Sequence, residues 1–138
     1  MNSHASITIE VHRDILLSAN GRYSHWAQKA WRVKALREFA AAAWRTAGSP
    51  QMSRAHCTIH VTYPKGTHVR DLDNLRPAVK ALIDGLVHPA PGLRGILPDD
   101  SDKYMIGPDM RADTGPRQPH RYTFRIELRA AQAGEAAS

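Results

Sequence analysis

The stretch "AHCTIHVTYPKGTHVRDLDNLRPAVKALIDGL", residues 55–86, holds the two periodicities that decide the fold. Apolar and polar residues alternate over 55–63, which predicts a half-buried strand. From residue 75 onward the apolar residues recur at helical spacing instead, so a helix is predicted over 75–87, ended by the proline- and glycine-rich "HPAPGLRGILP". A strand followed by an amphipathic helix favours a sheet that is covered by helices.

The remaining elements follow from the same two patterns. We predict strands over 6–12, 102–107 and 120–130 and a helix over 26–47. The segment "GPDMRADTGPRQP", residues 107–119, is predicted to be a flexible loop. The expected fold class is therefore α+β: residues 1–130 form one domain, a small mixed sheet packed with two main helices, and residues 131–138 form a flexible tail.

The charge of the chain points to an anionic partner. The 138 residues carry a formal net charge of +6, which favours nucleic acid first and an anionic membrane surface second, with a merely soluble basic protein as the alternative. Cys57 is the only cysteine, so an internal disulfide is excluded and a reducing setting is favoured. The N-terminal sequence lacks the apolar run of a signal peptide or membrane span, so we expect a cytoplasmic protein with no membrane partner.

Acidic residues stand directly ahead of the second predicted helix. Pro77 is tolerated only where its missing N–H would have no helical partner, which places it in the first turn and makes Asn74 the expected N-cap. Asp71 and Asp73 would then lie in an extended approach to the helix, where side chains two residues apart point the same way. Both carboxylates could face one point.

Two explanations of the acids stay open. In the first, Asp73 caps the helix, and Asp71 pairs with Arg70 or interacts with the positive end of the helix. Asp99 and Asp100 are then ordinary turn residues in "LPDDSD". In the second, the acids converge as hard oxygen ligands for Mg²⁺ or Mn²⁺ and support phosphodiester hydrolysis.

The second explanation is supported by a family resemblance. The stretch "RDLDNLRPAVKALIDGL" (70–86), followed by "GILPDD" (95–100), resembles the RusA family of Holliday-junction resolvases, with Asp-x-Asp-Asn before a helix and a later Asp-Asp after a short hydrophobic turn. "SANGRYSHW" (18–26) is similar to the family's N-terminal Asn-x-Arg-Tyr loop. The resemblance extends over roughly residues 6–128.

The resemblance implies roles for individual residues. Asp71, Asp73 and Asp100 would be the metal-binding catalytic carboxylates, and Asp99 would support them as a further metal ligand. The family often has a catalytic lysine four residues after the second Asp, where this chain has a proline. Lys80 lies seven residues after Asp73, near the same helix face, and we hypothesise that it substitutes; a solvated charge near Asp84 is the alternative.

Basic and aromatic residues complete the expectations. The predicted DNA contacts are Lys65, His68, Arg70, Arg76 and Arg22, with Lys29 and Arg32 as further candidates. The three tryptophans, Trp26, Trp31 and Trp44, are expected to pack within the first helix rather than to stack on bases. Gly85 weakens the second helix unless another element approaches closely.

The resemblance implies a Mg²⁺-dependent endodeoxyribonuclease, with Mn²⁺ as the alternative metal and no small-molecule cofactor. Its partner would be a DNA four-way junction, and a homodimer would make the paired symmetric cuts that resolve it. The expected setting is the cytoplasm of a bacterium, with a phage or prophage as a further source. A non-catalytic nucleic-acid-binding protein and a generic branched-DNA nuclease remain the alternatives.

Overall fold

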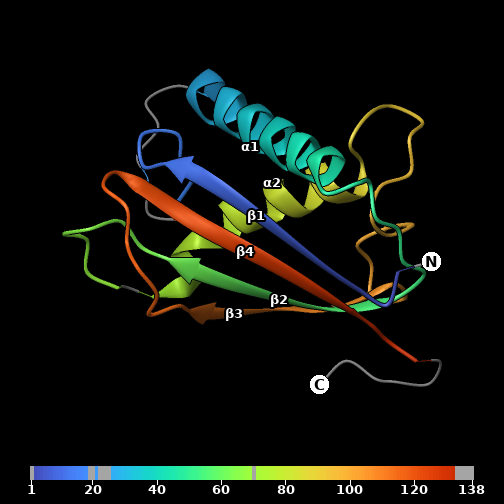
Figure 1. Cartoon of the computed structure of the whole chain (residues 1–138). Helices are drawn as coiled ribbons and strands as arrows, with labels where there is room; N and C mark the ends of the chain where they lie inside the picture. Colours follow the sequence, from blue (N-terminus) through green and yellow to red (C-terminus); the bar gives the residue numbers. More distant parts are fainter. Residues whose placement is uncertain (1, 19–20, 22–25, 70, 133–138) are drawn as a thin grey trace.

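Four strands form one mixed sheet in the order β1-β4-β2-β3 (Figure 1). The computed structural model describes residues 2–18, 21, 26–69 and 71–132. The strands are β1 (His4–His12), β2 (Ala55–Thr62), β3 (Met105–Ala112) and β4 (Arg121–Ala130). Strand β4 runs antiparallel to β1 and β2, whereas β3 pairs with β2 in parallel. A parallel pair needs a crossover connection, and the helix α2 (Arg76–Val87) lies in that crossover.

The helices lie together on one face of the sheet (Figure 1). Helix α1 (Trp26–Thr46) packs directly against α2. The two helices are in close contact at Gly85, where a Cβ atom would lie 2.3 Å from the Arg37 carbonyl oxygen and 2.8 Å from the Ala40 Cβ atom. The glycine that weakens α2 locally therefore lets two helix backbones meet.

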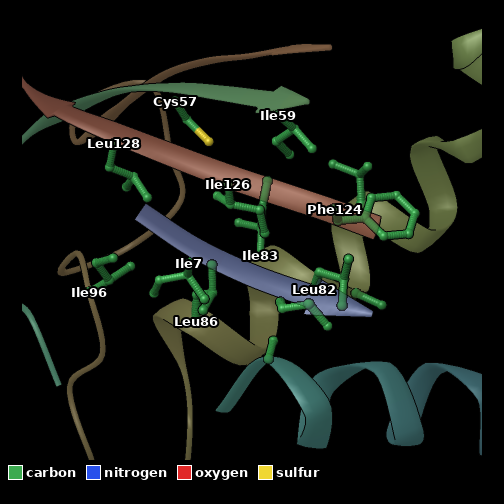
Figure 2. Close-up of a cluster of buried hydrophobic side chains, with 14 of the residues drawn as sticks. Ile7, Cys57, Ile59, Leu82, Ile83, Leu86, Ile96, Phe124, Ile126 and Leu128 are labelled. Atoms are coloured by element: carbon green, nitrogen blue, oxygen red, sulfur yellow. The ribbon is translucent and has the colours of Figure 1, made fainter. Parts of the chain in front are cut away.

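The core lies between this helical layer and the sheet. Figure 2 shows Leu82, Ile83 and Leu86 of α2 against side chains of β1, β2 and β4. Phe124 and Ile126 of the central strand β4 are fully buried. In β1 and β2 every second residue enters this core, as the alternation of apolar residues predicts. The expected α+β domain with a mixed sheet and two main helices is thus confirmed.

The third strand lies later in the chain than predicted. It spans 105–112 rather than 102–107, so the predicted flexible loop at 107–119 is wrong over its first half. The glycine and proline that suggested a loop, Gly107 and Pro108, lie where the register with β2 shifts, on an edge strand. Edge strands and bulges are the places where a sheet tolerates proline, because no ladder hydrogen bond is lost there.

Two predicted segments fall largely outside the described residues. Most of the loop at 18–26 and residues 133–138 of the predicted tail belong to them. Neither described helix is both long and apolar enough to cross a membrane.

Candidate functional site

A groove of about 610 Å³ lies beside the first half of α2, between that helix and the start of β3. We call it the α2–β3 groove. Its apolar walls come from α2 and β3, with Val79, Ile83 and Met105 among them. Its polar and charged residues are Asp73, Arg76, Lys80 and Asp100. The two carboxylates come from segments 27 residues apart in the chain, and the fold places both on this one groove.

The chain enters α2 through a short 3₁₀ helix, η1 (Leu72–Leu75), and not through an extended segment as predicted. Asp71 caps η1: its carboxylate oxygen accepts a hydrogen bond of 3.0 Å from the Asp73 backbone N–H. The prediction that Asn74 is the N-cap of α2 is therefore wrong. The N-cap is Leu75, whose side chain forms no capping hydrogen bond. A side-chain cap is not needed here, because η1 continues directly into α2 and the proline in the first turn has no backbone N–H to satisfy.

Asp73 forms a close ion pair within the same turn. Its Oδ1 accepts a hydrogen bond from Arg76 Nε at 2.8 Å, and both side chains are more than half exposed. The pair is an exposed contact of neighbours on one helical turn and adds little stability by itself. Arg76, predicted to contact DNA, thus lies beside a predicted catalytic carboxylate.

Lys80 lies between two carboxylates. Its Nζ is 4.0 Å from Asp100 Oδ2 and 3.9 Å from Asp84 Oδ1, while its side chain is 73% exposed. The hypothesised catalytic position and the alternative, a charge near Asp84, are therefore both consistent with where the ammonium lies. Its exposure leaves the ammonium free to swing toward a bound phosphate.

The other predicted ligands lie elsewhere. Asp71 and Asp99 do not line the α2–β3 groove: the first caps η1, and the Asp99 carboxylate lies 3.7 Å from His88 Nε2. Within residues 2–18, 21, 26–69 and 71–132, no three His, Cys, Asp or Glu side chains form a group that could hold a metal. Asp73 and Asp100 still offer the donors that suit Mg²⁺, which usually keeps several waters and takes one or two protein carboxylates.

The predicted DNA contacts are dispersed. Lys65 and His68 are exposed in the segment after β2 and are not part of the groove lining. Arg22 and Arg70 lie outside the described residues. Of the predicted basic contacts, Arg76 is the one that the described structure places on the groove.

One of the three tryptophans is buried and two are exposed, which the helical pattern did not predict. Trp44 is buried and its indole N–H donates a hydrogen bond of 2.8 Å to the Pro50 carbonyl, as expected of a packing residue. Trp26 and Trp31 are 77% and 46% exposed, so the prediction that they pack is wrong. Helical spacing alone does not distinguish the buried face, because α1 carries alanine on several faces.

An ionic cluster on the sheet face opposite the helices was also missed. Glu127 accepts from Arg125 and has His60 Nε2 at 3.0 Å and His4 Nε2 at 3.6 Å from its carboxylate oxygens. Burial by itself raises the pKa of Glu127, but the arginine and the two histidines outweigh it and hold that pKa below its usual range. The alternation of polar residues in the strands indicates that these side chains share one face of the sheet, but it does not indicate which of them form ion pairs.

No model of a known protein family matches the chain, and no curated protein matches it.

Proposed function

We propose that this protein is a Mg²⁺-dependent, structure-selective endodeoxyribonuclease of the RusA type, which resolves DNA four-way junctions. The observation that carries the proposal is that Asp73, Asp100 and Lys80 line one groove. These are two hard oxygen donors and a mobile cation, side chains that suit metal-dependent phosphodiester hydrolysis.

The chemistry divides among these residues. When bound, Mg²⁺ would supply charge that stabilises the crowded anionic transition state and would activate the attacking water. Asp73 and Asp100 would hold the ion, with Mn²⁺ as a substitute. The Lys80 ammonium, within 4.0 Å of Asp100, would bind a non-bridging phosphate oxygen and offset its charge.

Substrate and assembly are part of the same proposal. A four-way junction has approximate two-fold symmetry, so a C2 homodimer would present one groove to each of the two opposing strands. The net charge of +6 suits a polyanionic substrate. We place the activity in the cytoplasm of a bacterium or a phage-infected cell, on the grounds of the family resemblance and the single cysteine.

A second function is favoured by a specific observation. Asp71 is engaged as a cap and Asp99 lies beside His88, so two of the four predicted ligands have structural partners. In a non-catalytic nucleic-acid-binding protein these acidic residues would have only such structural roles. A generic nuclease of branched DNA differs from the first proposal only in its choice of substrate.

One cleavage experiment separates the three. Wild type, Asp73→Asn and the control Asp102→Asn, an exposed turn carboxylate outside the groove lining, are incubated with a mobile four-way junction, a flap and a linear duplex. Paired symmetric nicks in the junction alone, lost with EDTA or Asp73→Asn and kept with Asp102→Asn, are the expected result. Equal cutting of flaps would indicate the generic nuclease. Metal-independent binding without any cleavage would overturn the catalytic proposal.

A further inference from the structure

A second groove, of about 800 Å³, runs along α1 on the side of the segment 88–92 that follows α2. We call it the α1 groove. Its lining shares no residue with the α2–β3 groove. Small apolar side chains contributed by α1 form part of its lining: Ala30, Val33 and Ala41. Arg45 crosses to the opposite wall, where its guanidinium lies 3.5 Å from the Pro89 carbonyl oxygen.

The charged side chains of the α1 groove are mostly positive. Helix α1 contributes Lys29, Lys34, Arg37 and Arg45 to the lining but a single carboxylate, Glu38, which lies 3.9 Å from the Lys34 ammonium. All of them line the groove, so their charges act on the same space. The groove thus complements an anion.

The spacing of the cations indicates a polymer. Lys29 and Arg45 are sixteen positions apart, which corresponds to about 24 Å along a helix. A small anion would reach one or two of these side chains, whereas a chain of regularly spaced phosphates can meet all of them. The observed charge pattern therefore favours a nucleic-acid backbone over a single nucleotide or inorganic phosphate.

An exposed aromatic side chain stands at the N-terminal end of the same groove. Trp26 lines it and is 77% exposed, whereas tryptophan is on average a highly buried residue. An aromatic ring beside a basic track is the arrangement that binds unpaired bases, at about 1–3 kcal/mol per stacked base. In a duplex the bases are already stacked on each other, so the tryptophan favours a single strand.

We infer that the α1 groove binds single-stranded DNA, with phosphates on Lys29, Lys34 and Arg37 and one base stacked on Trp26. The inference goes beyond the proposed nuclease, because it requires neither the carboxylates nor a metal. In the proposed junction resolvase, the strand in this groove would be an arm that has lost its pairing at the branch.

The test is a binding titration of the full chain with fluorescein-labelled oligo-dT of about 15 nucleotides, in EDTA, by fluorescence anisotropy. Lys29→Ala/Arg37→Ala is compared with Arg13→Ala/Lys103→Ala, which removes the same charge from exposed sites outside the groove. We expect ~10-fold weaker binding for the first variant and a salt dependence shallower by about 1.4 in the log–log slope, as two lost phosphate contacts imply. The control variant should bind within about twofold of wild type, because long-range charge is screened.

Trp26 gives an independent readout. Trp26→Ala should weaken oligo-dT binding by ~10-fold, and Trp26→Phe should restore most of the loss, because phenylalanine keeps a stacking face. Equal losses in the groove and control variants would overturn the inference, as would equal competition by poly-glutamate, which would indicate an acidic protein partner. Duplex DNA that competes as well as oligo-dT would overturn the single-strand assignment. The titration is run in EDTA and measures binding rather than cleavage, so a failure here is distinct from a failure of the nuclease proposal.

Discussion

The backbone of Arg37 in α1 occupies the space that a side chain at Gly85 in α2 would need, with 2.3 Å between its carbonyl oxygen and a Cβ atom placed there. The two helices meet at this glycine. Helix α2 also contributes Arg76 and Lys80 to the lining of the α2–β3 groove. The position of the candidate site relative to the sheet therefore depends on a contact on the far side of the helix.

Gly85→Ala should destabilise the protein by about 1–3 kcal/mol, because the overpacked helices must separate and this exceeds the roughly 1 kcal/mol that alanine gains in helix propensity. Urea unfolding followed by circular dichroism measures the change. Gly115→Ala is the control, since a Cβ atom there would meet nothing closer than 3.6 Å. A stability loss no larger than that of the control would show that the helices can move apart freely.

Neighbouring Asp99 and Asp100 should respond differently to the same substitution. Asp100 lines the α2–β3 groove, whereas Asp99 lies beside His88 outside it. If the nuclease proposal holds, Asp100→Asn should lower the rate of single-turnover cleavage by more than ~100-fold, because mutating even a residue that only supports a metal ligand can lower activity by that factor. Asp99→Asn should lower the rate by less than ~10-fold. The reverse order would move the metal site to the His88 side of the turn.

Lys80→Ala should separate stability from activity. The ammonium is largely exposed, so its pairs with Asp84 and Asp100 contribute less than about 1 kcal/mol and unfolding should barely change. Cleavage under single-turnover conditions should fall by about 100-fold if the ammonium stabilises the phosphate. Lys103→Ala, another exposed lysine, is the matched control. Wild-type cleavage by Lys80→Ala would end the hypothesis that this lysine replaces the one missing at Pro77.

Cys57 should be inert in the native protein. Its burial, with a smaller contribution from the Asp109 carboxylate, raises the pKa of the thiol to about 12, so almost no thiolate exists near neutral pH. A thiol reagent such as DTNB should react slowly at pH 8 and at once after unfolding in urea, with one equivalent per chain. Rapid reaction of the folded protein would indicate that β2 opens readily to solvent.

The Glu127 cluster predicts a loss of stability in acid. Because its pKa lies below the ordinary 4.5, the ionised carboxylate stabilises the folded state above about pH 4.5, and this contribution is lost as the pH falls through the folded-state pKa. Glu127→Gln should therefore be less stable than wild type at pH 7, by about 1 kcal/mol, and the difference should close toward pH 3. Glu10→Gln, on the same face with Arg121 at 3.5 Å, should show a smaller change. A difference that stays constant with pH would assign the effect to packing.

Periodicity alone was enough for most of the fold. The alternation in β1, β2 and β4 and the helical spacing in α2 are strong because each of these elements buries one face. It failed at β3, where Gly107 and Pro108 lie on an edge strand and only pairing with β2 decides the conformation.

The candidate site was predictable in part for a related reason. Asp73 and Asp100 were singled out as acids at the ends of predicted elements, and they do line one groove. The 3₁₀ turn that gives Asp71 a capping role depends on local hydrogen bonds that spacing does not encode. The α1 groove was missed because its opposite wall, residues 88–92, approaches α1 only through the packing of α2.

The strand order carries a consequence for biosynthesis. β4, which follows the other three strands in the chain, lies between β1 and β2, and β1 pairs only with β4 in the described sheet. A nascent chain that ends before residue 121 can join β2, α2 and β3, but β1 has no partner strand until β4 is made. The sheet is thus joined by the ten residues of β4, and a premature stop there would leave β1 and β2 with unpaired backbone edges that are prone to aggregation.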